Sequence, residues 1–269
     1  MIDTTRPAAV AGMFYPGSVS ALRSEIGALM ATAARHDGLR PKACIAPHAG
    51  YIYSGPIAAS AYALLPPLAD MIHRVVLLGP VHRVWTQGLA LPDVQAFATP
   101  LGEVRLDQEA IAAIADLPQV TIHAAAHAQE HSLEVHLPFL QTVLEDFRLV
   151  PLAVGDATPQ QVAEVLDRLW GGPETLIVVS SDLSHYLPYQ AAQRQDLSTV
   201  RSIEALHTNL VGKQACGAHP LNGLLLAAKQ RGLVPHLLDL RNSGDTAGDK
   251  SRVVGYAAFA FTEAADARQ

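Results

Sequence analysis

The fold is indicated first by the stretch VVLLGPVHR, residues 75–83, an apolar and β-branched-rich run that ends in a Gly-Pro turn and a histidine. Such a run is typical of a strand buried inside a sheet. Segments of helical periodicity separate it from most of the other runs of this kind, which predicts βαβ crossovers. We therefore expect an α/β fold whose largely parallel or mixed sheet carries helices on both faces. The predicted strands are Ala43 to Pro47, Arg74 to Gly79, Arg148 to Gly155, Thr175 to Ser181 and Val253 to Phe261.

The intervening segments repeat their apolar residues at helical spacing. A run from Leu233 to Leu240 is followed by the last predicted strand without a helix between them, which predicts an antiparallel edge pair. No internal repeat, low-complexity tract or Ser/Gly linker divides the chain, so we expect a single domain over residues 1–269 with a core from about 6 to 262. The predicted helices are Val19 to Arg35, Pro56 to Leu65, Gln108 to Leu117, Glu130 to Glu145, Pro159 to Leu169, Tyr189 to His207 and Pro220 to Gln230.

The composition favours a well-buried globular protein, with 49% hydrophobic and 16% charged residues in a chain of 269. A net charge of −6 and the lack of extended Lys/Arg clusters predict no nucleic-acid partner and no anionic-membrane partner. Two cysteines, Cys44 and Cys216, cannot build a disulfide framework. No apolar stretch is long enough for a membrane span, and the first residues do not resemble a secretion signal. These features predict a cytoplasmic location.

Three predicted strands end in polar turns that carry a histidine. The run CIAPHAGY contains His48, VVLLGPVHR contains His82, and LIVVSSDLSHY contains Asp182 and His185. Ligands of open α/β sheets bind beyond the carboxyl ends of the strands, and imidazole is the commonest metal ligand. A lone histidine after a strand is more often a surface or hydrogen-bonded residue. Three at equivalent places predict one metal-capable pocket.

The turn RNSGDTAGD, residues 241–249, offers an anionic ligand for this pocket. Two imidazoles and one carboxylate form the facial set that holds Fe(II), and Asp245 is the candidate carboxylate. The alternative interpretation is that Asp245 supports the turn between the last two strands. Near a predicted helix start, the thiol of Cys216 could bind a soft metal, although a structural role is the simpler expectation.

The segment AAAHAQEHSLEVH, residues 124–136, holds the densest group of ionisable side chains. His127, Glu130 and His131 match the H-x-x-E-H pattern of inverted zinc proteases, in which the glutamate is the general base. A protease would leave the histidines at the strand ends without a role. We therefore expect Glu130 and His131 to lie at the start of a helix and to orient the metal ligands, with His136 structural.

Seven motifs in order resemble the Memo family (mediator of cell motility), from about Arg6 to Thr262. The resemblance implies a domain related to the class III extradiol ring-cleaving dioxygenases, with a strand-end pocket for iron or copper. It also implies that His48 and His82 are metal ligands and that His185 is an acid/base residue. The motifs are AGMFYPGS, IAPHAGYIYSGPIAASAY, LLGPVHR, EHSLEVHLPFLQ, VVSSDLSHY, CGAHPLNGLL and SGDTAGDKSRVVGYAAF.

Two positions depart from the pattern of the animal members. Alignment of the last motif places Thr246 where those proteins carry a cysteine, and Phe14 stands where they carry a tryptophan. A threonine hydroxyl is a poor metal ligand. Either Asp245 replaces the cysteine or the site binds metal more weakly.

Three functions follow as hypotheses. The first is an oxidoreductase or dioxygenase-like enzyme that depends on Fe(II) or copper, with an unknown substrate, in which His185 moves a proton and Asp182 fixes its tautomer. The second is a non-catalytic module that binds a metal or peptide, acting with the radical-SAM protein and small companion protein that often accompany bacterial and archaeal relatives. The third is a zinc protease through His127, Glu130 and His131.

Overall fold

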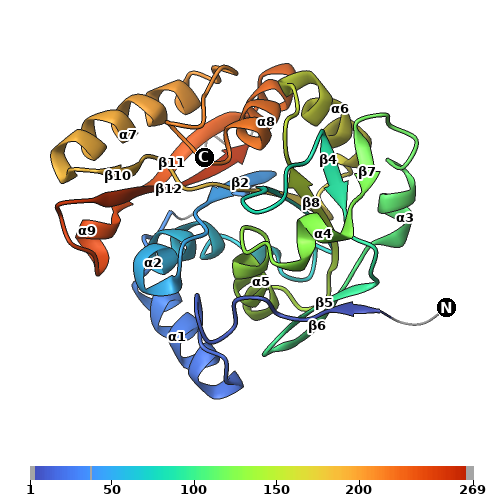
Figure 1. The fold of residues 1–269 in the computed structure, drawn as a ribbon, viewed down its shortest axis with the longest axis horizontal. Helices are drawn as coiled ribbons and strands as arrows, with labels where there is room; N and C mark the ends of the chain where they lie inside the picture. Colours follow the sequence, from blue (N-terminus) through green and yellow to red (C-terminus); the bar gives the residue numbers. More distant parts are fainter. Residues whose placement is uncertain (1–3, 37, 265–269) are drawn as a thin grey trace.

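A mixed β-sheet runs through the middle of the computed structural model, which describes residues 4–36 and 38–264 (Figure 1). The described strands are β1 (Thr5–Arg6), β2 (Ala43–Ala46), β3 (Arg74–Pro80), β4 (Leu89–Leu91), β5 (Ala96–Thr99), β6 (Gly102–Arg105), β7 (Val120–Ile122), β8 (Arg148–Val154), β9 (Thr175–Ser180), β10 (His185–Leu187), β11 (Val234–Asn242) and β12 (Val253–Thr262). The main sheet has the order β10-β12-β2-β9-β3-β8-β4-β7, with β11 paired to β12. A small second sheet has the order β1-β5-β6.

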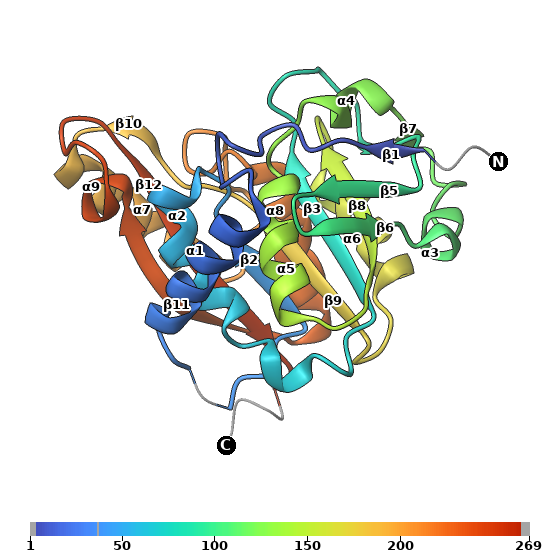
Figure 2. The same cartoon turned by 90° about the horizontal axis from the view of Figure 1, so that it is seen from below.

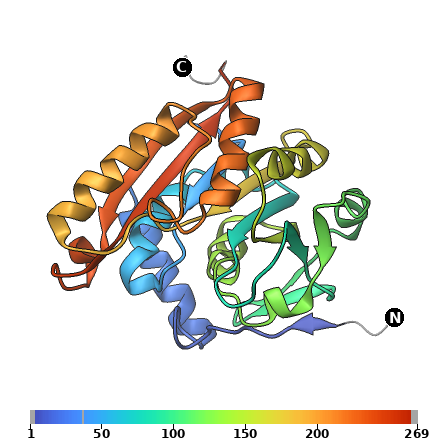
Figure 3. The same cartoon turned by 45° about the horizontal axis from the view of Figure 1, so that its top comes forward.

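Helices cover both faces of the main sheet, as expected (Figures 2 and 3). The described helices are α1 (Val19–Thr32), α2 (Tyr51–Tyr62), α3 (Gln108–Ala112), α4 (Ala124–Ala128), α5 (Leu137–Val143), α6 (Pro159–Leu169), α7 (Tyr189–Glu204), α8 (Ala218–Arg231) and α9 (Ser243–Thr246), with short 3-10 turns η1 (Pro66–Leu68) and η2 (Glu134–His136). Apolar side chains of α1, α2 and α5 belong to one core, and those of α3, α6, α7 and α8 to the other. None of these described helices has the length and apolar character needed to cross a bilayer.

The centre of the sheet is a parallel ladder in which β2 pairs with β9, β9 with β3, and β3 with β8. All four strands are mostly apolar and buried, and β3, β8 and β9 are rich in branched residues, because both faces of the sheet are covered. Their parallel direction brings the carboxyl ends of β2, β9 and β3 to one edge. The predicted antiparallel pair is confirmed: β11 lies against β12, which also pairs with β2 on its other side.

The predicted helix from Glu130 to Glu145 is wrong in its first half. Residues 130–133 form a turn, a 3-10 turn follows, and α5 begins only at Leu137. Proline favours the first turn of a helix, and Pro138 stands there. The side chain of Glu130 accepts hydrogen bonds from the backbone N–H groups of His131 and Ser132. These hydrogen bonds stabilise the non-helical turn that precedes α5.

The buried carboxylate of Glu134 anchors the amino-terminal segment across the molecule. It accepts hydrogen bonds from Arg6 Nη1 at 2.7 Å, from the N–H groups of Ala9 at 2.8 Å and Val10 at 3.0 Å, and from the Tyr15 hydroxyl at 2.6 Å. Both members of the Arg6–Glu134 ion pair are almost completely excluded from solvent. This carboxylate therefore determines the path of residues 6–15 above the carboxyl edge of the sheet.

We predict that Glu134→Gln lowers the free energy of unfolding by about 3–5 kcal/mol, because the buried Arg6 guanidinium loses its counter-charge. Urea unfolding followed by circular dichroism measures the change. Asp116→Asn is the matched control, since its ion pair with Arg168 is exposed and should contribute less than about 1 kcal/mol. Equal effects of the two substitutions would contradict the anchoring role.

Candidate metal centre

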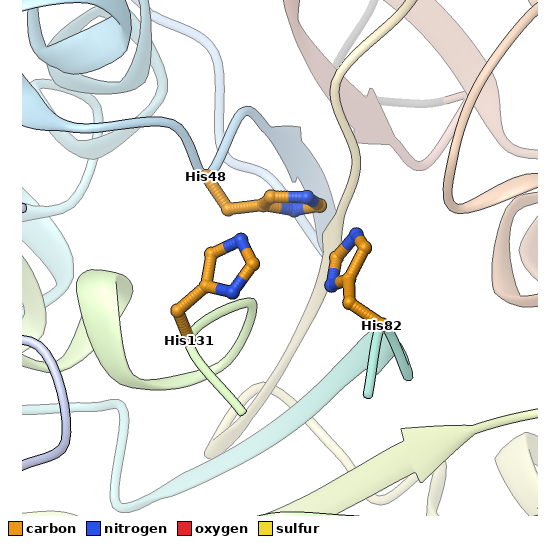
Figure 4. Close-up of side chains that lie close together, drawn as sticks. All are labelled: His48, His82 and His131. Atoms are coloured by element: carbon orange, nitrogen blue, oxygen red, sulfur yellow. The ribbon is translucent and has the colours of Figure 1, made fainter. Parts of the chain in front are cut away.

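Three imidazole rings meet beyond the carboxyl ends of the parallel strands (Figure 4). One ring nitrogen from each of His48, His82 and His131 lies within 4.8 Å of the corresponding nitrogens of the other two. The ring centroids are 5.1 Å apart for His48 and His82, 5.4 Å for His48 and His131, and 4.6 Å for His82 and His131. The first two follow β2 and β3, and the third comes from the turn after α4. Imidazole sets of this kind suit zinc, copper and iron.

The protonation of His48 is determined by the hydroxyl of Ser180, the last residue of β9. Ser180 Oγ lies 2.6 Å from the carbonyl oxygen of Ser132, and this oxygen can only accept, so the hydroxyl hydrogen points there. His48 Nδ1 lies 2.6 Å from the same hydroxyl and must therefore donate its hydrogen. The Nε2 atom of His48 is left with a free lone pair, which is the form that binds a metal.

A second buried histidine completes this network. His136 Nε2 donates to Ser180 Oγ at 2.8 Å, and its Nδ1 accepts from the Tyr62 hydroxyl at 2.7 Å. Burial lowers the pKa of His136 to about 3, so its ring stays neutral. The expected structural role of His136 thus takes a specific form: it supports the serine that orients His48.

Glu130 orients the rings of His82 and His131. Its carboxylate accepts from the backbone N–H of His82 at 2.6 Å and from His82 Nδ1 at 2.9 Å, which leaves His82 Nε2 unprotonated. The same carboxylate lies 3.3 Å from His131 Nδ1 and favours the same tautomer there. Burial would raise the pKa of Glu130, but the hydrogen bond and charge of His82 and the N–H of Ser132 outweigh it, and the pKa falls to about 2. Glu130 therefore supplies a fixed negative charge beside the rings.

Burial keeps the rings of His48 and His131 neutral near neutral pH. Burial, followed by the proximity of the other histidines, lowers the pKa of His48 well below its ordinary value. Burial lowers the pKa of His131 to about 4 despite the opposing charge of Glu130, and the charges of His82 and Arg83 act in the same direction as burial. These two rings therefore offer lone pairs rather than positive charges.

A thiol lies next to this cluster. Cys216 Sγ is 3.3 Å from His48 Nε2, the nitrogen that the tautomer leaves unprotonated. Burial, with a contribution from the charge of Asp182, raises the pKa of this thiol to about 12. The thiol becomes a ligand only when a metal displaces its proton, because the thiolate is the binding form. Cys216 therefore lies against His48 at the edge of the three-ring cluster.

The structure does not bring Asp245 and Thr246 into the cluster. Asp245 caps the short helix α9, where its carboxylate accepts from the N–H of Asn242 at 2.9 Å and from the Tyr189 hydroxyl at 2.5 Å. The Thr246 hydroxyl donates to the carbonyl of Ser243. The turn-supporting alternative therefore describes Asp245. His131 is the third side chain of the cluster instead of Asp245. The cysteine that lies beside the cluster is Cys216.

The polar residues after β9 are close to the cluster, but Asp182 contacts a different partner from the one expected. Asp182 Oδ1 accepts from the backbone N–H of His48 at 2.8 Å, and burial raises the pKa of this carboxyl. The tautomer of His185 is set by the carbonyl of Leu183, which accepts from His185 Nδ1 at 2.9 Å. Asp182 thus positions the His48 loop, and His185 keeps an unprotonated Nε2.

The arrangement required by the zinc-protease pattern is not formed. His127 lies in α4, which ends at Ala128, whereas His131 follows in the turn, so the two do not share a helix face. His127 Nε2 lies 2.8 Å from the carbonyl of Ala90, and the ring packs edge-on against Phe97 in the interior. Glu130 contacts His82 and His131, as the preferred interpretation requires.

Phe14 contacts the cluster through His131. Its ring centroid is 4.8 Å from that of His131, and the Glu134 anchor holds its loop in place. The role of Ser180 and the place of His131 among the three clustered rings were not predicted from the sequence. The available signal for Ser180 was its place at the end of a predicted strand, in the same run that leads to His185.

Comparisons with known proteins identify relatives over nearly the whole chain. Residues 6–260 match the family described as Memo-like protein. The chain is 35% identical over 269 residues to a MEMO1 family protein of Aquifex aeolicus, across 95% of this chain and 98% of the relative. It is 37% identical over 288 residues to one of Methanopyrus kandleri, across 95% and 98%. An uncharacterised Escherichia coli protein of known structure is 14% identical, with a TM-score of 0.47 over 74% of this chain and 91% of that one.

We predict that Ser180→Ala releases the His48 tautomer. In the metal-free wild-type protein, nitrogen-15 NMR of the histidine side chains should show His48 protonated at Nδ1, and the variant should show a mixture. Loss of the shared acceptor should also lower the free energy of unfolding by about 1–3 kcal/mol. Ser198→Ala, on the exposed side of α7, is the control and should change neither quantity. A wild-type His48 protonated at Nε2 would contradict the assignment.

Proposed function

This chain belongs to the Memo family, and from that premise we propose that its histidine cluster binds one Fe(II) ion and forms the centre of a dioxygenase-like oxidoreductase. The observation that carries the proposal is the convergence of His48, His82 and His131, at least two of which present an unprotonated Nε2. Neutral nitrogen donors fit a divalent ion of the first transition series. The adjacent thiol of Cys216 adds a donor that can join when it loses its proton.

The bound ion would supply a Lewis-acidic, redox-active centre for the oxygen atoms of a substrate. The residues of the chain supply the rest. Glu130 holds His82 by its Nδ1–H and places one negative charge behind the cluster, which offsets part of the charge of a divalent ion. Ser180, at the end of the neighbouring strand β9, holds His48 in the same way. Neither ring therefore needs to reorient when a metal binds.

His185 is the proposed proton carrier. Its Nδ1–H donates to the Leu183 carbonyl, so its Nε2 is free to accept a proton from a substrate hydroxyl. The ring is only partly buried, and its charge is among those that lower the pKa of His48, which places it near the cluster. Histidine is the side chain most often used for general acid–base catalysis.

A second candidate is a non-catalytic module that holds a metal for a partner protein. The observation that favours it is the donor set itself: in the described part of the chain, the three-histidine group contains no carboxylate, unlike the facial set of Fe(II) oxygenases. Imidazoles with a thiol also suit copper. Oxygen consumption with small aromatic substrates distinguishes the two candidates, since a metal-holding module shows no turnover.

We predict stoichiometric binding of Fe(II) to the metal-free protein in an anaerobic titration. His48→Ala should weaken binding by more than about 100-fold, because changes to residues that only orient ligands already cost about 10–100-fold. His207→Ala is the matched control, since this histidine lies on the exposed end of the α7 segment and makes no side-chain hydrogen bond within the described residues. Equal iron binding by wild type and His48→Ala, or none by either, would contradict the proposed site.

A further inference from the structure

A pocket of about 380 Å³ opens directly beside the histidine cluster. His82 and Cys216 form part of its wall, so its contents would lie against the proposed metal centre. The rest of the lining includes Arg83 and Trp85 from the loop after β3. Volumes of about 300–1,000 Å³ are usual for small-molecule sites. The pocket is therefore large enough for one small substrate in contact with the cluster.

Arg83 is the charged feature of this pocket. Its guanidinium makes no ion pair and no side-chain hydrogen bond within residues 4–36 and 38–264. The acidic Asp156 also lines the pocket but does not pair with Arg83. A free guanidinium offers a fork of N–H donors that matches a carboxylate or phosphate, and such charge-assisted bonds are among the stronger ones. This end of the pocket therefore suits an oxyanion.

Trp85 is the apolar feature, two residues beyond Arg83. Its side chain is 76% exposed, although it lines the pocket. The other tryptophan, Trp170, lies in a different pocket, and its ring is already covered by the Arg231 guanidinium at 4.1 Å from its centroid. An exposed indole face beside a small pocket is suited to stacking on a planar ring.

We propose that this pocket holds the substrate of the metal centre, and that the substrate is a small planar aromatic molecule carrying an oxyanion group. The Arg83 guanidinium binds the oxyanion, and Trp85 covers the ring. The assignment of this ligand as the substrate rests on the proposed function, because it places the ring next to His82 and Cys216. The binding of an aromatic anion itself depends only on the pocket and is tested without metal.

Tryptophan fluorescence provides the test. Trp170→Phe leaves Trp85 as the sole tryptophan and retains an aromatic ring for Arg231. Titration of this metal-free protein with benzoate should quench the fluorescence, and the neutral analogue benzamide should bind at least about 10-fold more weakly. Phenyl phosphate, compared with benzoate, distinguishes a phosphate from a carboxylate ligand. The same titrations are repeated with Fe(II) present.

In the Trp170→Phe protein, the further substitution Arg83→Gln should weaken benzoate binding by about 10-fold or more. Arg83→Lys should retain part of the binding. Arg23→Gln is the matched control, because Arg23 is also exposed and unpaired in the described structure but lines a pocket away from the cluster. Equal binding of benzoate and benzamide, no effect of Arg83→Gln, or no anion binding with and without Fe(II) would overturn the proposal. Benzoate binding to a protein that fails to bind Fe(II) would overturn only the proposed metal function.

Discussion

The hydrogen bond from His48 Nδ1 to Ser180 Oγ joins the ends of β2 and β9 and determines what the site can do. The serine hydroxyl has a single hydrogen, which it gives to the Ser132 carbonyl, so its two histidine neighbours must both donate. A buried network that is satisfied in only one pattern fixes the tautomers of its members. Because that pattern leaves His48 Nε2 unprotonated, the ring is preorganised to bind a cation.

A single carboxylate performs the corresponding function on the other side of the cluster. Glu130 is 3% exposed, and four N–H groups point at its two oxygens. A buried charge is tolerated only when it is hydrogen-bonded in this way. The same hydrogen bonds hold the turn that carries His131 and the loop that carries His82. The contacts that stabilise the buried charge of Glu130 therefore also set the geometry of the cluster. Together, Ser180 and Glu130 fix the orientation of the rings.

The sequence was sufficient for the central strands of the main sheet and for two of the three rings, whereas the short strands β4, β7 and β10 were not predicted. Buried parallel strands have a distinctive composition, and His48 and His82 stand at the ends of two of them, where such sheets bind ligands. His131 could not be placed in the same way, because its turn exists only through hydrogen bonds to Glu130 that replace a predicted helix. The partner of Asp182 depends on the pairing of β2 with β9, a register that no local pattern specifies.

We propose above that His48, His82 and His131 bind one metal ion through their Nε2 atoms. A crystal structure of protein loaded anaerobically with Fe(II), with anomalous scattering measured at the iron edge, tests it most directly. We expect one strong anomalous peak within about 2.0–2.3 Å of these three nitrogens, a distance typical of metal–imidazole bonds. A peak elsewhere, for example at Asp245, or binding through a ring Nδ1 would contradict it.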